Sequence, residues 1–296
     1  MKYVVDERAS IRELVQWTLG RSVQHLLNHT NALFGDGDGD AEAVHQARVA
    51  TRRLRSDLRT FRPVLVPATV EELRAELRWL GDALGSVRDI DVLLLCLRRS
   101  ADRLPESDQS VVAALLQKLD DERRGALTLL ADAVASDRYL RLAGDLVAAS
   151  RRPPLQSGSD GPAAEIAPAL VARRWRQLRR LVKRLDPDPS DEELHAVRIS
   201  VKRTRYAAEA VMPVVGTPAR RLAHHLASVQ DILGEQHDAV VAERWLRKAA
   251  RAASPEAALV AGQLVAIART EAEHCRRGWR AAWHRAARPK NTRWLE

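Results

Sequence analysis

Five basic side chains in the first quarter of the sequence recur at intervals of three and four residues. They are His45, Arg48, Arg52, Arg55 and Arg59. On a helix of 3.6 residues per turn, these positions form one narrow stripe. Like charges one turn apart repel by roughly 0.2–0.5 kcal/mol per pair, so helix stability alone does not explain the stripe. Because an Arg guanidinium group can take two phosphate oxygens at once, the stripe predicts a surface that binds a phosphate-rich anion.

A second segment repeats this stripe 150 residues later, and Arg53 and Arg203 lie at the edges of the two stripes. The repeated positions are His195, Arg198, Lys202 and Arg205. One alternative is a solvated face, or ion pairs formed with neighbouring helices by the acidic residues Asp89, Asp91 and Asp238. A repeat of the same cationic spacing in both halves favours anion binding over that alternative.

A third basic helix is expected over residues 170–185. Its cations have the same spacing, with apolar residues on the opposite face, and they are Arg173, Arg176, Arg180 and Lys183. The corresponding segment of the first half contains Gln24, His25 and Asn28 instead. The second half is therefore expected to hold more of the anion.

The segments that must position these stripes are typical of an all-α protein. Ala, Leu, Arg and Glu dominate, and aromatic residues are only 4% of the sequence. No alternating strand pattern bounded by turn residues is present. In the first stripe helix, apolar residues that include Ala47, Leu54 and Phe61 lie on a different face from the cations and suit a buried core.

The sequence contains an internal repeat. Residues 44–49 match residues 194–199, and a Leu-Gly…Asp motif at 84–89 matches the one at 233–238. Each half has about four substantial helices, which is enough for a four-helix bundle.

A linker is expected at residues 151–162, which contain three prolines and two glycines. It would separate a first repeat at 1–150 from a second at 163–296. In the second repeat, Ser190 with Glu193 predicts a capping box, and Ser254 before Pro255 predicts another helix start.

The net charge of +9 favours an anionic partner, such as a phosphate chain, a nucleic acid or an acidic membrane. The first 150 residues are slightly acidic and the rest are strongly basic, so the positive charge is unevenly distributed along the sequence. No run of 18 apolar residues occurs, which argues against a membrane-spanning helix and a membrane role. Acidic residues interrupt the first thirty positions, and there are only two cysteines, so a cytoplasmic protein is expected.

The motifs at 44–55, 84–92, 194–209 and 230–238 together resemble the CHAD family, the conserved histidine α-helical domain. The resemblance implies two four-helix bundles related by a pseudo-twofold axis, forming one compact unit with a basic central groove or pore. It also implies binding of inorganic polyphosphate, often at polyphosphate granules, with phosphate or sulfate ions able to occupy the site in crystals. Members are often fused to a CYTH-type triphosphatase, whose Glu-x-Glu-x-Lys opening is not found here, which weakens an inference of hydrolysis.

By position, the resemblance assigns ten residues to the polyphosphate site. They are His45, Arg48, Arg52, Arg53, Arg55, His195, Arg198, Lys202, Arg203 and Arg205. Arg59 and the cations of the third basic helix are added from stripe geometry alone.

Other kinds of site have weaker support. Residues 36–40 are similar to a calcium loop, but Ala41 and Ala47 stand where a glycine and a glutamate are expected. His224, His225 and His237 lack the ligand spacing of zinc proteases. We therefore expect no metal site, no cofactor and no catalytic residue.

Non-enzymatic binding of polyphosphate is thus the first hypothesis, and a general polyanion or nucleic-acid binding protein is the alternative. Nucleic acid is disfavoured because the tryptophans are not interleaved with the cations, as they are in single-strand binders. Two further hypotheses about function remain: a phosphotransfer module that uses His45, and a polyphosphate-processing enzyme. The sequence does not specify an oligomeric state.

Overall fold

The chain folds into helices joined by short loops. A computed structural model describes residues 5–33, 41–251 and 253–296, and it is 85% helical without strands in these ranges. The all-α prediction is therefore confirmed. The first half forms α1 (Ile11–Ala32), α2 (Ala41–Phe61), α3 (Pro67–Ala101), η1 (Glu106–Asp108), α4 (Gln109–Ala135) and α5 (Asp137–Arg151).

The second half follows the same order of long helices. Its elements are α6 (Ala163–Lys183), α7 (Asp191–Ala210), α8 (Met212–Val215), α9 (Thr217–Ala250), α10 (Pro255–Ala286), α11 (Pro289–Thr292) and η2 (Arg293–Leu295). None of the helices in the described ranges combines the length and apolarity needed to cross a lipid bilayer.

The predicted helix starts in the second half are confirmed. At α7, the Ser190 hydroxyl accepts the Glu193 N–H, and the Glu193 carboxylate accepts the Ser190 N–H. At α10, the Ser254 side chain accepts a backbone N–H, and Pro255 occupies the first turn. These caps satisfy N–H groups that have no partner inside the helix.

Within its described residues, the first half has one long helix more than the expected set of about four. After α4, Ser136 adopts an extended conformation, and its side chain accepts the N–H of Tyr139, which starts α5. Tyr139 and Leu142 of α5 are buried in the main core. Because the break consists of one serine without Gly or Pro, the sequence pattern gave no clear sign of it.

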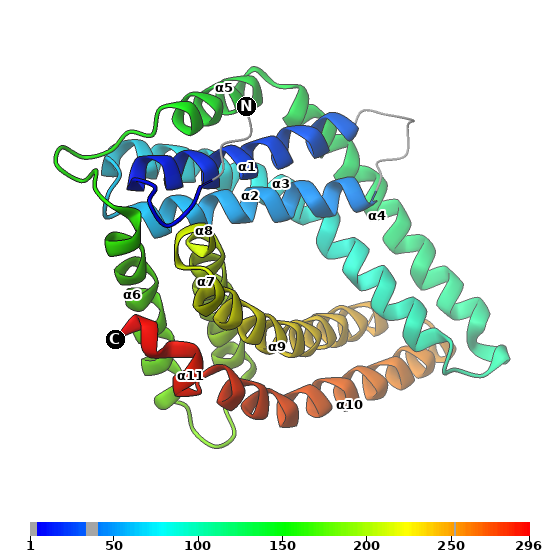
Figure 1. The fold of residues 1–296 in the computed structure, drawn as a ribbon. Coiled ribbons are helices and arrows are strands. Elements are labelled where there is room, and N and C mark those ends of the chain that lie inside the picture. Colours follow the sequence, from blue (N-terminus) through cyan, green and yellow to red (C-terminus); the bar gives the residue numbers. More distant parts are fainter. Residues whose placement is uncertain (1–4, 34–40, 252) are drawn as a thin grey trace.

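Figure 1 shows α1, α2, α3 and α5 along one side of the molecule and α10 along the opposite side, with α7 and α9 between them. Helix α2 contacts α7, and α3 contacts both α9 and α10. The main apolar core includes residues of α1 and α2 together with residues of α6 and α7, and a smaller one joins α3 and α4 to α9 and α10. The two halves therefore share their cores. The pseudo-twofold relation and the bounds of the two repeats stay predictions.

The apolar faces predicted for the two stripe helices are buried. On α2 they include Ala47, Thr51, Leu54, Leu58 and Phe61, and on α7 they include Val197, Val201 and Thr204. Because this burial fixes the rotation of each helix about its axis, it also fixes the direction in which the cations point.

Candidate anion-binding site

Helices α2 and α7 bring four basic side chains together, and we call this set the central cluster: Arg48 and Arg52 from α2, Arg198 and Lys202 from α7. Burial, followed by the charges of Arg198, Arg52 and Arg48, lowers the pKa of Lys202 to about 7. Burial also lowers the pKa of Arg198, with Arg52 and Arg48 contributing. The four side chains are half-buried. They are thus close enough to repel one another across the α2–α7 contact.

Two carboxylates approach the central cluster, one from each half. Arg48 pairs with Asp89 of α3 at 3.0 Å, and Arg198 lies 3.9 Å from Asp238 of α9. Two of the ion pairs that the sequence offered as the alternative to anion binding, those of Asp89 and Asp238, are therefore present. Each carboxylate offsets one cation, which leaves Arg52, and Lys202 in its protonated form, as the net positive charge of the cluster.

The glycine of each Leu-Gly…Asp motif lies where a cluster arginine crosses the neighbouring helix. A Cβ atom at Gly85 would be 2.8 Å from Arg48 Nη1, whereas one at Gly234 would be 3.9 Å from Arg198 Nε. A distance of 2.8 Å is shorter than real Cβ contacts allow, and 3.9 Å is ordinary contact. Gly85 therefore lets Arg48 lie flat against α3 and reach Asp89.

Replacing Gly85 by Ala is expected to displace the Arg48 guanidinium and to weaken anion binding by about tenfold, or about 1.4 kcal/mol. The fold should not suffer, because Ala favours a helix over Gly by about 1 kcal/mol and the atom that must move is the end of a flexible side chain. Calorimetric titration with polyphosphate and thermal unfolding measure the two effects. Gly234→Ala is the matched control, with affinity within about twofold of wild type. Equal losses in both variants would contradict this role of Gly85.

The stripe histidines have different neighbours in the two halves. In the second half, Nδ1 of His195 lies 3.1 Å from Nδ1 of His237 on α9, and the two ring centroids are 4.3 Å apart. Burial lowers the pKa of His237 to about 4, with Arg198 and His195 contributing. In the first half, burial and then Arg88 of α3 lower the pKa of His45. The imidazoles of His45 and His237 are thus kept neutral at pH 7, and that of His237 lies within hydrogen-bonding distance of His195.

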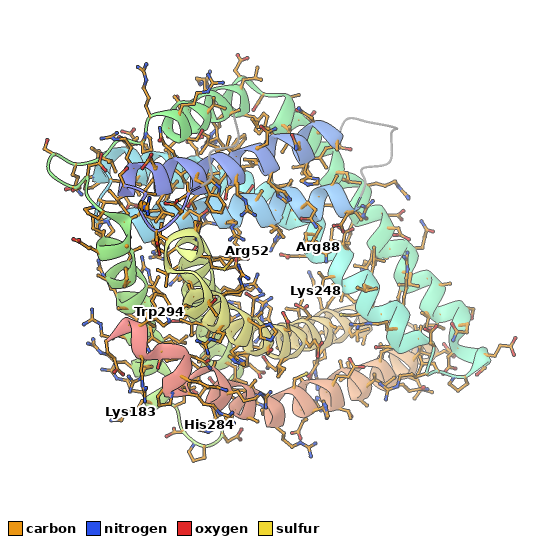
Figure 2. The ribbon with its side chains drawn as sticks, in the orientation of Figure 1. Arg52, Arg88, Lys183, Lys248, His284 and Trp294 are labelled. Atoms are coloured by element: carbon orange, nitrogen blue, oxygen red, sulfur yellow. The ribbon has the colours of Figure 1, made fainter. Side chains whose placement is uncertain are left out.

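Sequence reasoning missed several residues beside the central cluster. Arg88 and His237 each lie three positions after the motif glycine of their half, and that shared spacing is the signal that could have found them. Figure 2 shows Arg52 of α2, Arg88 of α3 and Lys248 of α9 around the space between these helices. Arg244 of α9 is close enough to contribute to the lowered pKa of His195. Cations from α3 and α9 thus extend the basic surface of α2 and α7.

Two predicted site residues, Arg53 and Arg205, share one carboxylate within the protein. Both pair with Glu209, at 2.7 Å and 3.1 Å, and both lie against the ring of Tyr206 at 5.6 Å and 5.3 Å from its centroid. The same tyrosine accepts a hydrogen bond from Nε of Arg52 at 3.2 Å. Arg53 and Arg205 therefore join α2 to α7 and hold Arg52 in place, and Glu209 offsets one of their two positive charges.

The far end of the α2 stripe belongs to a second group of cations. Burial lowers the pKa of Arg203, followed by the charges of Arg59, Arg74 and Arg55. Arg174 of α6 joins this group, since its Nη2 donates to the carbonyl oxygen of Arg59 at 2.8 Å and burial lowers its pKa to about 10. Arg174 was missed because it lies beside the α6 stripe rather than on it.

The remaining predicted cations, on α6, lie elsewhere. Arg176, Arg180 and Lys183 line a pocket between α6 and α10, and Arg173 is exposed on the same helix. Figure 2 shows Lys183 at a corner of the molecule, distant from Arg52. The apolar side of α6 is buried in the core, which turns these cations away from the central cluster.

No three His, Cys, Asp or Glu side chains converge as metal ligands in the described part of the chain. Asp91, considered above with Asp89 and Asp238, forms an ion pair with Arg123 at 2.6 Å. The sequence similar to a calcium loop, at 36–40, lies outside the described residues.

The fold and the central cluster together define an all-helical protein in which similar helices from two halves bring basic side chains face to face. The chain belongs to the CHAD domain family, whose model matches residues 18–247. The resemblance found in the sequence motifs is therefore confirmed.

Two solved structures and a curated relative are similar to this chain. The crystal structure of the CHAD domain from the plant Ricinus communis superposes with a TM-score of 0.74 at 28% identity, covering 96% of this chain and 95% of that one. PptA from Streptomyces chartreusis shares the fold with a TM-score of 0.77 at 24% identity, covering 92% and 98%. The uncharacterized protein Rv2226 of Mycobacterium tuberculosis is 32% identical over 282 residues, which are 90% of this chain and 52% of that protein. The chain thus spans about half the length of that relative.

Proposed function

We propose that this protein binds inorganic polyphosphate without modifying it, through the central cluster and the cations that extend it. The CHAD domain family is known for polyphosphate-related proteins. The observation that carries the proposal is the convergence of Arg48, Arg52, Arg198 and Lys202. Burial and mutual repulsion disfavour the charged forms of these side chains, and an anion bound between them would stabilise those forms. A location in the cytoplasm, at polyphosphate granules, is part of the same proposal.

A linear phosphate chain suits the shape of this basic surface. The α2 stripe from Arg48 to Arg59 extends for about 16 Å at 1.5 Å per residue, and it presents a cation at each turn. It begins in the central cluster and ends in the second group beside Arg74 and Arg174. Each charge-assisted hydrogen bond contributes roughly 1.5–3 kcal/mol, so several along one chain would give tight binding.

A general polyanion or nucleic-acid binding protein is the second candidate, and the net charge of +9 is the observation in its favour. Single-strand binders stack bases on exposed aromatic rings placed among the cations. Tyr206, the tyrosine that hydrogen-bonds Arg52, is only 3% exposed and is already covered by Arg53 and Arg205. A flexible phosphate chain needs no such ring.

Competition binding separates the two candidates. Labelled long-chain polyphosphate is bound to the protein, and duplex DNA, single-stranded RNA or unlabelled polyphosphate is added at equal phosphate concentration. We expect unlabelled polyphosphate to displace the label at least tenfold more effectively than either nucleic acid, since the cluster recognises closely spaced phosphoryl groups. Equal displacement by DNA or RNA would reject polyphosphate specificity and support the general polyanion binder. Release of orthophosphate from the polyphosphate would reject the non-enzymatic reading.

A further inference from the structure

A second basic pocket lies between α6 and the C-terminal part of α10, apart from the central cluster. Its volume is about 740 Å³, and its lining includes Arg176, Arg179, Arg180 and Lys183 of α6 with Arg280 and His284 of α10. Figure 2 shows Lys183 and His284 together at one corner of the molecule. The pocket thus takes basic residues from two helices, as the central cluster does.

The cations of this pocket are not neutralised by the protein. Among the residues that the structure describes, no ion pair involves Arg176, Arg179, Arg180 or Lys183. Glu296 is the one carboxylate in the described lining. The lining therefore has an excess of positive charge that no ion pair in the described part of the chain offsets.

The floor of the pocket is apolar and packed. The rings of Trp175 on α6 and Trp283 on α10 pack at 5.3 Å between centroids, and both are buried. Arg280 donates to the carbonyl oxygens of Asp186 and Pro187, which ties α10 to the loop after α6. The cations therefore line a pocket between two helices that contact each other, instead of lying on a flat solvated face.

The arrangement also limits the size of the ligand. The four α6 cations occupy positions i, i+3, i+4 and i+7, so they cover only about 10 Å of helix. That length matches a short, multiply charged anion better than a long chain. Arg guanidinium groups and a Lys ammonium group at this spacing are typical ligands of phosphoryl oxygens.

We propose that the α6–α10 pocket is a separate binding site for a compact anion with three or more phosphoryl groups, such as tripolyphosphate. It is independent of the central cluster, and either site can be correct without the other. The α6 stripe then belongs to this pocket and not to the path of a long polyphosphate chain.

Calorimetric titration with tripolyphosphate tests this site in a protein whose central cluster is disabled by Arg52→Ala and Lys202→Ala. We expect this protein to bind one tripolyphosphate per chain, and the further changes Arg180→Ala and Lys183→Ala to weaken that binding at least tenfold. Arg180 and Lys183 are exposed, so the fold should persist, which circular dichroism checks. Glu296→Gln removes a negative charge from the lining and should tighten binding several-fold, a gain that structural damage would not produce.

Two results would overturn the proposal. One is that the protein with the disabled central cluster binds no tripolyphosphate, which would place all binding in the central cluster. The other is that it binds tripolyphosphate with an affinity that neither the Arg180→Ala and Lys183→Ala pair nor Glu296→Gln changes. A separate titration with long-chain polyphosphate, which compares wild type with the Arg52→Ala and Lys202→Ala protein, tests the central cluster, so the two sites are judged separately.

Discussion

The double variant Arg52→Ala and Lys202→Ala is expected to lose at least about 100-fold in affinity for long-chain polyphosphate. These two side chains are the net positive charge of the central cluster, because Asp89 and Asp238 offset Arg48 and Arg198. Two charge-assisted hydrogen bonds at roughly 1.5–3 kcal/mol each correspond to about 100-fold or more. Calorimetric titration measures the loss.

Thermal stability should not fall with affinity in this variant. Lys202 is repelled by Arg198, Arg52 and Arg48, so removing two of the four charges relieves repulsion inside the protein. The melting temperature is expected to stay the same or to rise, a trade of stability for function found at many binding sites.

Lys118→Ala with Arg141→Ala is the matched control. Both residues are exposed on α4 and α5, and the change in net charge is the same. We expect this control to bind polyphosphate within about threefold of wild type, since exposed charges beyond a Debye length of about 8 Å are screened. If the control loses as much affinity as the cluster variant, the total charge of the protein drives binding and the central cluster has no special role.

Affinity for polyphosphate is expected to fall as the pH rises from 7 to 8.5. The pKa of free Lys202 is lowered to about 7 by burial and by Arg198, Arg52 and Arg48, so its charge is lost over this range. A bound anion favours the protonated form and raises the pKa of Lys202 in the complex. Binding above pH 7 therefore takes up a proton, and the affinity falls by up to about tenfold per pH unit.

Other titratable groups near Lys202 act at lower pH. Burial and nearby cations lower the pKa of His195 and, to about 4, that of His237, so both stay neutral from pH 7 to 8.5. Asp238, whose pKa is raised by burial, is a weaker acid than usual. The interior phosphoryl groups of a long chain are strongly acidic and keep their charge. The change between pH 7 and 8.5 is therefore assigned to Lys202.

Lys202→Met isolates this effect, since it is uncharged at every pH. At pH 8.5 its affinity should approach that of wild type, and at pH 6.5 it should be at least tenfold weaker. Titrations in buffers with different ionisation enthalpies measure the proton uptake. A wild-type affinity that is constant from pH 7 to 8.5, or a variant with the same deficit at every pH, would contradict the role of Lys202.

The helical class, the basic stripes and their buried faces could be predicted from the sequence because they depend on periodicity within one helix. Ala47 and Leu54 had to be buried once α2 was a helix, and Arg48 and Arg52 then had to lie on another side. Ion pairs by Asp89 and Asp238 were only the alternative to anion binding at the sequence level, and the structure supplies their partners, Arg48 and Arg198.

The sequence could not show which stripe cations face the central cluster and which form ion pairs or line another pocket. That outcome depends on which elements pack against each helix. Glu209 lies four positions after Arg205 on α7, yet only the contact between α7 and α2 brings Arg53 to the same carboxylate. Likewise, periodicity gave the α6 stripe, but the pocket it lines depends on how α10 packs beside α6. Arg88 and Arg244 come from α3 and α9, whose approach to the stripes is a tertiary contact.

A crystal structure of the protein with polyphosphate of defined length tests the central claim most directly. We predict a continuous chain of phosphoryl groups between α2 and α7, within hydrogen-bonding distance of Arg48, Arg52, Arg198 and Lys202, and extending toward Arg59. A chain that binds only along the exposed cations of α6, or that leaves Arg52 and Lys202 without a phosphoryl contact, would contradict the account.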